Sequence, residues 1–352
     1  MSTNVQQIVR SRPARGFSII DVTATIAAAA VICAVAVPLA SAKDEISLRA
    51  ISYFNLAELN IVHTTYAVDH KDRQFSVIPD DYAQFSGVDA YEAANGCIDP
   101  LILGVGPAGS TWGYYLGCGA QAGTVANIAV YKPIDFLSPN SGAYRFANTP
   151  KINVYANGRF FDPLFFAAED NAITPAQRRF IRNGTDYANS ATGGLGFTSY
   201  TMSPAAMFHP IVMGDGQSAS GTLFKSPSAT VAGGMGYQSP TVSQCTYPSL
   251  KTRLMENTMM ENAPSPCNPA YGGCVPYTWY QSAASTNLAL FYDGSVDIFS
   301  AQEAMQADSD SGTGLWLRTT PLGSSGMFSN ANVQSGAHFL TKFGIKGRDR
   351  LQ

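Results

Sequence analysis

One carboxylate stands at the head of a long apolar stretch near the start of this 352-residue chain. Asp21 is followed by residues 22–42, which contain no charged side chain. An ionised carboxylate in apolar surroundings costs a few kcal/mol unless it is paired, so such residues are usually functional. We therefore expect Asp21 to pair with a positive group. The alternative is that it lies at the boundary between apolar and polar surroundings.

A glycine-rich run from Gly104 to Gly109 has the GxGxxG spacing of dinucleotide-binding loops. The context that such a loop needs is missing. Pro107 lies inside the turn, residues 110–113 do not begin a good helix, and no acidic residue follows about twenty positions later. We interpret the run as a glycine-rich surface loop.

Consecutive side chains that carry oxygen atoms, as in a calcium-binding loop, occur at Asp308, Ser309 and Asp310. A calcium loop also needs a distal glutamate that binds through both oxygens, and the sequence has none at the required distance. A solvated turn is the expected structure, and weak calcium binding is the alternative. No other cofactor or metal is predicted.

Patterns typical of catalysis are otherwise lacking. His63 and His70 are seven residues apart and share a helix face, but two histidines without a third ligand favour packing or solvent roles. Ser218 and Ser220 lie in no nucleophile elbow, because the second glycine of that motif is absent. The sequence therefore does not predict an enzyme.

The elements that would position Asp21 are helical. Residues 22–42 are long enough to cross a bilayer, and the preceding residues 1–16 carry three arginines and no acid, which favours a cytoplasmic N-terminus. From 43 to 68, apolar residues recur every three or four positions, as in an amphipathic helix. Together they predict one helix over about 17–68, roughly 75 Å long, bent at Pro38. The repeating residues are Leu48, Ile51, Leu59, Val62 and Tyr66.

These features resemble the type IV pilin and type II secretion pseudopilin superfamily. Its signature is a short basic leader, a glycine before the cleavage site, a phenylalanine or methionine after it, an acid at the fifth mature position and, in many members, a helix-kinking proline. Those places are filled here by Gly16, Phe17, Asp21 and Pro38. The family usually has Glu where this chain has Asp21.

The resemblance implies a leader peptide of 1–16, removed by a prepilin peptidase, and a methylated Phe17. It also implies a structural filament subunit in which Asp21 pairs with the terminal amine of a neighbouring copy. Residues 17–42 would be the transmembrane and assembly helix, and 43–68 the stem. The implied partners are other copies of the chain, the peptidase, an inner-membrane assembly platform and the lipid bilayer. We accordingly expect a single-pass inner-membrane protein before assembly, with its head outside the cytoplasm.

Two alternatives remain open. Ala40, Ser41 and Ala42 form an A-x-A site, so residues 1–42 could be a secretory signal peptide removed before Lys43, leaving a soluble protein. The head could instead be a surface-binding module for a polysaccharide, with aromatic residues as its platform. The candidates for that platform are Trp112, Tyr114 and Tyr115.

The composition limits the fold class and the partners expected for the head, which we place at 69–352. Only 13% of residues are charged and the chain is rich in glycine, proline and tyrosine, which favours an α+β fold with an antiparallel sheet and long loops. The net charge of -3 would become more negative by three on loss of the leader, which argues against nucleic-acid binding.

Cysteine usage is consistent with export. We expect disulfides of Cys97 with Cys118 and of Cys267 with Cys274, with Cys245 free or exchanging with one of the latter two, although connectivity does not follow from sequence.

Several local elements can be placed in the head. Strands are predicted at 126–132 and 151–156, helices at 174–182 and 250–261, and loops with short strands over 183–245. Residues 287–292 and 296–299 flank an Asp-Gly pair, which predicts a hairpin with a type I′ turn. Ser300 and Glu303 then predict a capped helix to about Ala307.

The hairpin is similar to the C-terminal domain of large pilin-like proteins abundant in planctomycetes. Those proteins carry a histidine, nine residues and then Asp-Gly. Asp293 and Gly294 match that turn motif, and Ala283 stands where the histidine would be. We therefore expect no metal or acid-base site at this turn. Residues 56–69 and 314–318 also resemble the family.

Overall fold

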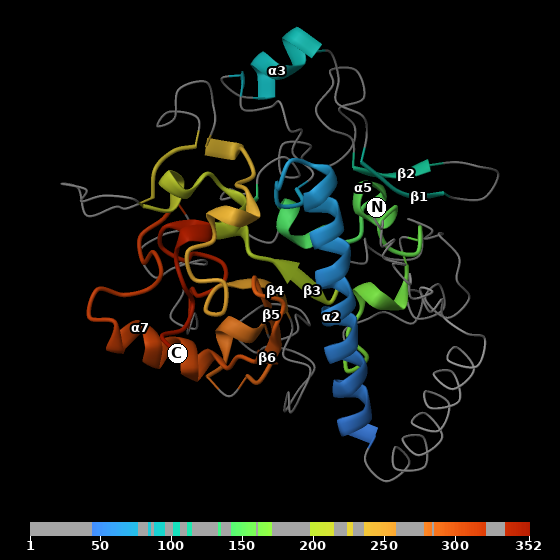
Figure 1. Cartoon of the computed structure of the whole chain (residues 1–352). Coiled ribbons are helices and arrows are strands. Elements are labelled where there is room, and N and C mark those ends of the chain that lie inside the picture. The colour runs from blue at the N-terminus through green and yellow to red at the C-terminus, as the bar shows by residue number, and fades with distance from the viewer. Residues whose placement is uncertain are drawn as a thin grey trace, which may run out of the picture. The chain divides into compact units, whose positions relative to one another are not determined.

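The computed structural model describes most of the C-terminal two thirds of the chain (Figure 1). The described residues are 44–76, 84–85, 88–95, 101–105, 111–114, 133–134, 142–159, 161–170, 198–214, 224–227, 236–257, 278–283, 285–321 and 335–352. Residues Leu48–Gln352 form one compact unit. The fold class is α+β, as predicted, with an antiparallel sheet of four strands.

The stem prediction is confirmed as helix α2, Asp44–Asp69. Its residues Leu56, Leu59, Val62 and Tyr66 are buried in the main core, so α2 is part of the head's folded unit rather than a separate stalk. Ile51 was predicted to be part of the same apolar face, but it is 49% exposed. The part of the predicted helix that precedes α2 lies outside the described residues.

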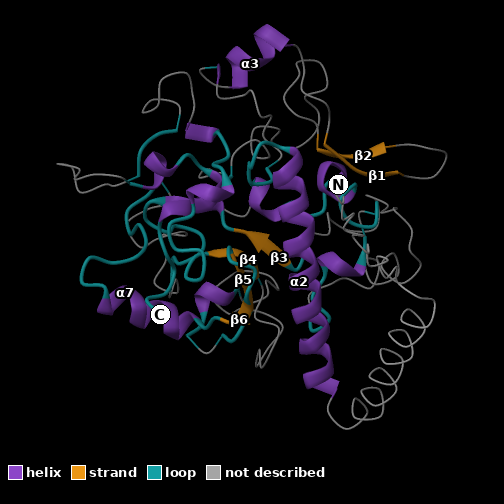
Figure 2. Cartoon of the chain, in the orientation of Figure 1, coloured by secondary structure: helices purple, strands orange, loops and turns teal. Residues whose placement is uncertain are grey.

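Figure 2 shows the main sheet beside α2. Its strand order is β3-β4-β5-β6, with every pair antiparallel. The strands are β3 Tyr200–Met202, β4 Thr252–Glu256, β5 Leu288–Phe291 and β6 Val296–Ile298. Every residue of β3, β4 and β5 is buried, whereas β6 at the edge exposes two of its three.

The prediction of a helix over 250–261 is wrong, because this segment supplies β4. Leucine, methionine and glutamate favour helices by only a few tenths of a kcal/mol each. The backbone of β4 is hydrogen-bonded to strands on both sides, and all five of its side chains are buried. Burial and pairing therefore outweigh local propensity. Residues 258–261 lie outside the described part.

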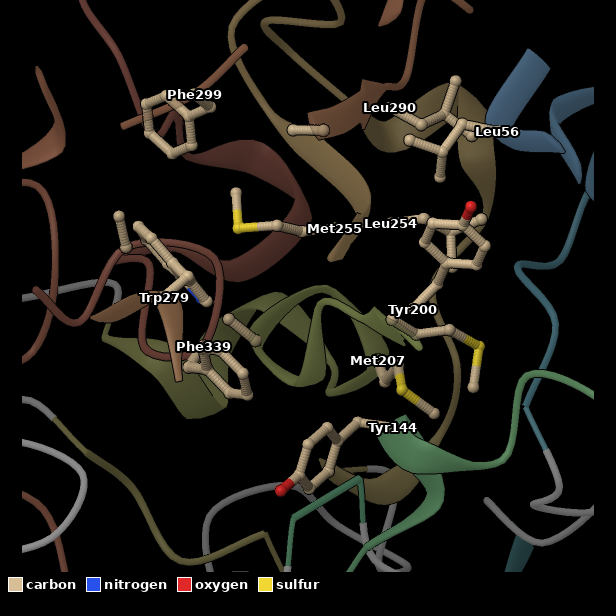
Figure 3. Packing of buried hydrophobic residues seen from close by; sticks show 14 of the residues in the cluster. Leu56, Tyr144, Tyr200, Met207, Leu254, Met255, Trp279, Leu290, Phe299 and Phe339 are labelled. Carbon is tan, nitrogen blue, oxygen red and sulfur yellow. The ribbon is translucent and has the colours of Figure 1, made fainter. Parts of the chain in front are cut away.

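Aromatic and aliphatic side chains fill the core around this sheet (Figure 3). Leu56 of α2 lies beside Leu290 and Leu254 in the figure. Trp279 belongs to the same cluster, with ring centroids 5.8 Å from Phe299 and 6.5 Å from Phe339. Segments from both ends of the described chain thus share one core.

Short elements complete the described structure. They are α3 Val88–Asn95, the antiparallel pair β1 Leu101–Val105 and β2 Thr111–Tyr114, and α5 Pro150–Asn153. Seven short 3-10 helices lie at 143–145, 163–165, 204–207, 210–213, 242–244, 279–281 and 344–346. The described parts of 183–245 thus contain one short strand and 3-10 helices.

The strand predicted at 151–156 is wrong. Pro150 occupies the first turn of helix α5, a position that its fixed φ angle and missing N–H suit. Thr149 before it is extended, and the chain turns away after Asn153. The proline outweighs the alternating pattern of the residues that follow it. The elements predicted at 126–132 and 174–182 lie outside the described residues.

The C-terminal hairpin is confirmed, but its turn type is not. Asp293 is not among the residues with positive φ, and Gly294 has φ +89°, whereas a type I′ turn needs both residues left-handed. The amide of Gly294 donates to the carbonyl of Phe291 at 3.0 Å, and the amide of Phe291 donates to that of Ser295 at 2.9 Å. This is the pattern of a three-residue loop that ends in a left-handed glycine.

Side chains hold this loop in place. Asp293 Oδ1 accepts hydrogen bonds from the amide and the hydroxyl of Ser295, at 2.9 and 2.6 Å. A Cβ atom on Gly294 would come within 2.7 Å of Asn60 Nδ2, so the tip of the hairpin lies directly against α2. The turn motif therefore joins the last hairpin to the first described helix.

The helix after the hairpin is confirmed as α7, Ala301–Asp310. The hydroxyl of Ser300 accepts the amide of Glu303 at 3.0 Å, as the capping pattern predicts. Ala301, Ala304 and Ala307 of α7 join the main core.

The expectation of a single-pass inner-membrane protein has to be corrected. Within the described ranges, no helix combines the length and the apolar character needed to cross a bilayer. The longest helix there, α2, carries charged side chains along its length. The run at 17–42, to which the crossing was assigned, lies outside these ranges.

The hairpin geometry leads to a stability prediction. Gly294→Val should lower the free energy of unfolding by about 1 to 3 kcal/mol for the left-handed backbone and by roughly 1 kcal/mol more for the clash with Asn60. Gly158→Val is the matched control, because Gly158 has φ +71° but no atom within 4 Å of its Cβ position. Denaturant unfolding measures both variants. Equal losses would mean that the tip does not pack on α2.

Candidate functional site

The residues assigned to processing and assembly fall outside the described residues. These are Gly16, Phe17, Asp21 and Pro38, and the disulfide candidates Cys97, Cys118, Cys267 and Cys274 are outside as well. Cys245 is described, is half-buried and is a free thiol. Burial raises its pKa to about 11, so it is protonated at neutral pH.

Helix α2 has two apolar faces. One is the core face described above. The other carries Ile51, Phe54, Ile61 and Val68, which are 49%, 68%, 66% and 76% exposed. With the polar residues Glu58 and Thr65 between them, these positions alternate in steps of three and four along the helix. We call this set the α2 stripe. Apolar residues at such spacing are typical of a seam between packed helices.

A charged side chain of the sheet, Arg253 of β4, contacts α2. Where β4 pairs with β5, Thr252 lies opposite Phe291 and Leu254 lies opposite Leu290. Arg253 is therefore the extra residue of a β-bulge in β4. Its Nη1 donates to Asn60 Oδ1 at 3.3 Å and to Thr64 Oγ1 at 3.4 Å, both on α2. Its guanidinium also lies 5.5 Å from the ring centroid of Tyr292. The bulge thus directs a buried cation onto α2.

His63 lies beside that cation. Burial, followed by the charge of Arg253, lowers the pKa of His63 well below its usual value, so the ring is neutral. It packs edge-on against Phe75, with centroids 5.9 Å apart. His70 stacks on Tyr66 at 3.9 Å. The sequence predicted packing or solvent roles for these histidines, and in the structure His63 is buried in packing while His70 is half-buried.

Acidic groups meet near the N-terminal end of the described part of α2. Glu256 of β4 is almost completely buried, and its Oε2 accepts the amide of Leu288 at 2.8 Å. Burial raises the pKa of Glu256 to about 8; the Leu288 bond opposes this rise, and nearby Glu169 adds to it. Arg49 of α2 forms an ion pair with Glu169 at 3.8 Å. A neutral Glu256 thus stands among charged groups at this end of α2.

A second buried polar centre surrounds Asp349, near the C-terminus. Lys251 Nζ donates to Asp349 Oδ2 at 2.7 Å, and neither side chain is exposed. The amide and hydroxyl of Thr252 reach the same oxygen at 3.0 and 2.6 Å. Asp349 Oδ1 accepts the amide of His338 at 2.8 Å and the hydroxyl of Thr341. The carboxylate therefore accepts five hydrogen bonds.

Electrostatics fix the charge of this centre. Burial acts to raise the pKa of Asp349, but the charge of Lys251 and the donated hydrogen bonds outweigh it and hold the pKa at about 2. Burial lowers the pKa of Lys251, and Asp349 opposes that shift. Burial also lowers the pKa of His338 to about 3. Thr252 gives its only hydroxyl proton to Asp349, so His338 Nδ1, 2.8 Å away, is the donor to that oxygen.

This Lys-Asp-His-Thr set resembles catalytic machinery only in its residue types. Lys251, Asp349, His338 and Thr341 are each at most 1% exposed, and a substrate would need a route to them. The set instead connects the start of β4 with the C-terminal residues.

The calcium candidate has a different environment from the one predicted. Asp308 and Asp310 belong to the last turn of α7 rather than to a loop. Asp308 Oδ1 accepts the amide of Leu315 at 2.6 Å, and its Oδ2 is paired with Arg318. Asp310 accepts Gln306 Nε2 at 2.8 Å. Arg318 is therefore already paired with the Asp308 carboxylate that a calcium ion would need.

The remaining sequence candidates are only partly described. β1 includes the first two residues of the GxGxxG run, and β2, which pairs with it antiparallel, follows the run, so the segment after the run is a strand rather than the helix that a dinucleotide site requires. The backbone at 112 and 114 belongs to β2. Tyr115, Ser218 and Ser220 lie outside the described residues. Ala283 is exposed and follows the 3-10 helix at Trp279–Gln281.

Sequence reasoning missed both the α2 stripe and the Asp349 centre. The stripe was detectable, because its spacing of three and four is visible in the sequence, but one helix face was assumed to suffice. The Asp349 centre joins residues 203, 251, 252, 338, 341 and 349, which no local spacing relates.

Comparison with known proteins adds no further candidate. No protein-family model, curated protein or solved structure matches this chain.

The buried Glu256 leads to a prediction about pH. Its folded pKa of about 8 exceeds the value of 4.5 for an unperturbed glutamate, so its contribution to stability is complete below pH 4.5 and is lost as the pH rises to about 8. Glu256→Gln should match the parent near pH 5 and be more stable near pH 8.5, by on the order of a few kcal/mol. Denaturant midpoints at the two pH values test this.

Glu58→Gln is the control for that experiment, because Glu58 is exposed on α2 and the charge change is the same. It should follow the parent at both pH values. A Glu256→Gln variant whose difference from the parent is constant between pH 5 and pH 8.5 would contradict the assignment.

Proposed function

We propose that this protein is a structural subunit of a pilin-like filament, in which copies associate through their N-terminal helices. The observation that carries the proposal is the α2 stripe. A helix that already buries one apolar face in its own head has no need of a second one for folding. Exposed apolar side chains that recur along one line of a helix are typical of a seam between packed helices.

The geometry of the stripe favours another helix as its partner. Steps of three and four residues place Ile51, Phe54, Ile61 and Val68 on one narrow line along α2. Such a line packs against a similar helix at a shallow angle of about 20°. Because every copy of the chain carries the same line, association between copies meets this requirement without another protein. Glu58 within the line would disfavour close approach in some registers, which helps to select one.

The N-terminal sequence supports the same proposal. Gly16 and Phe17 fit a prepilin peptidase site, and removal of 1–16 would create a new amine at Phe17. Asp21 of a neighbouring copy offers the compensating charge. In this arrangement the amine and the carboxylate select the register, while the α2 stripe contributes apolar contact area further along the helix.

A second function, recognition of a surface or polysaccharide by the head, remains as the alternative. The observation that favours it is a polar hollow at the end of α7. A head that binds a ligand and a filament that displays the head are compatible.

The stripe can be tested by charge substitution. Phe54→Glu and Ile61→Glu should leave the thermal midpoint of the purified full-length chain nearly unchanged, since exposed positions cost about 0.5 kcal/mol or less. Both should strongly reduce the yield of filaments sheared from cells that produce the chain. Val154→Glu is the matched control, because Val154 is 74% exposed but lies on α5's trailing turn rather than on α2. Parental yields from both stripe variants would refute the role of the stripe.

Processing can be tested by the mass of the N-terminal peptide. The mature chain should begin at Phe17 and carry a methyl group. Asp21→Ala should leave this cleavage intact but abolish filaments, because a buried amine without its counter-charge costs several kcal/mol. An N-terminus at Lys43 would instead identify a secretory signal peptide and overturn the filament proposal.

A further inference from the structure

A hollow of about 440 Å³ lies where α7 ends and the chain returns toward residue 316. Its wall includes Asp308, Ser309, Thr313, Trp316 and Arg318. Two of these are hydroxyl side chains and two are charged. The hollow therefore offers hydrogen-bonding groups in a concave setting, which small ligands require.

Two glycines shape the hollow. Gly312 has φ +69° and Gly314 has φ +73°, a backbone that favours glycine. A Cβ on Gly312 would meet no atom within 4 Å, so that side of the hollow is open. A Cβ on Gly314 would lie 3.2 Å from Asp308 Oδ1 and 3.4 Å from Lys342 Nζ. Any side chain at 314 would press on the charged groups.

Arg318 is held in place with part of its hydrogen-bonding capacity unused. Its Nη2 pairs with Asp308, and its guanidinium carbon lies 5.1 Å from the ring centroid of Trp316. Its side chain is nevertheless 65% exposed. An arginine presents five N–H donors in a fixed plane. The buried carboxylate and the ring thus orient the plane, and the remaining donors face solvent.

The charge balance decides which ligand fits. Lys342 Nζ donates to the carbonyl of Thr313, next to the hollow. The charged residues that line the hollow are Arg318 and Asp308, and both oxygens of Asp308 are already engaged, while Lys342 lies just outside the lining. An exposed guanidinium edge is the preferred partner of a carboxylate, which it can bind through two parallel hydrogen bonds.

The hydroxyl groups and the tryptophan narrow the ligand further. Ser309 and Thr313 can exchange hydrogen bonds with ligand hydroxyls. Trp316 is only 5% exposed, with one flank against Gly336 and Arg318 at its ring. Its ring is therefore not available for stacking, the usual way to hold a neutral sugar. We propose that this hollow binds the carboxylate of an acidic sugar, a uronic acid, with Arg318 as the anchoring residue.

This site is independent of filament formation, so it can be tested on the purified full-length chain. Titration calorimetry with glucuronate should give saturable binding in the millimolar range, with glucose and inorganic phosphate binding at least about tenfold more weakly, the equivalent of one charge-assisted contact. Arg318→Gln should weaken glucuronate binding by about tenfold or more.

Arg348→Gln is the matched control. Arg348 also lies over an aromatic ring, that of Tyr247 at 5.2 Å, but it does not line the hollow, so its loss should leave binding unchanged. Arg318 also holds Asp308, and Arg318→Gln could unfold the loop. Ser309→Phe therefore serves as a second variant, since it fills the hollow from an exposed helix position, with Gln302→Phe on the same helix as its control.

Three results would overturn the proposal. One is the absence of saturable glucuronate binding up to tens of millimolar. Another is equal binding of glucuronate and either glucose or phosphate, which would leave a non-selective surface. The third is unchanged affinity in a folded Ser309→Phe variant.

Discussion

The carboxylate of Asp349 is the group on which much of the described fold depends. Through five hydrogen bonds it ties the C-terminal residues to the first residues of β4 and to the loop that carries His338. β4 is central to the sheet, and the bulge that follows Thr252 directs Arg253 onto α2. Asp349, β4 and Arg253 thus connect the last residues of the chain with its first described helix, α2. A buried pair of this kind is weak evidence for net stability, but loss of either partner would leave an uncompensated charge in the core.

Sequence patterns predicted the elements whose causes are local. The hairpin, the Ser300 cap of α7 and the amphipathic stem follow from turn residues, capping residues and periodicity, and all three are present. Predictions failed where distant contacts decide the structure. β4 has helix-favouring residues but lies between two strands. Asp293 can adopt a left-handed backbone, yet the loop length places only Gly294 there.

The candidate sites divide in the same way. Spacing within one helix could have revealed the α2 stripe, because its positions are set by the helix period alone. Nothing local indicated that Asp308 would be paired with Arg318, because the nine residues between them form a helix end and a loop whose path depends on packing. The sequence predicted a solvated turn at Asp308, with calcium binding as the alternative. The fold instead makes it a buried support for an exposed arginine.

The two faces of α2 impose opposite requirements on the same helix. Its core face must keep the head folded, which requires Leu56, Leu59 and Val62 to remain apolar and buried. Its stripe exposes apolar groups that a folded monomer gains nothing by retaining, because each exposed large side chain forgoes on the order of 1 kcal/mol or more that burial would supply. A helix under selection for monomer stability alone would carry polar residues at Phe54, Ile61 and Val68. In the filament that we propose, the corresponding helix of a neighbouring copy would cover these side chains in every subunit except those at the ends.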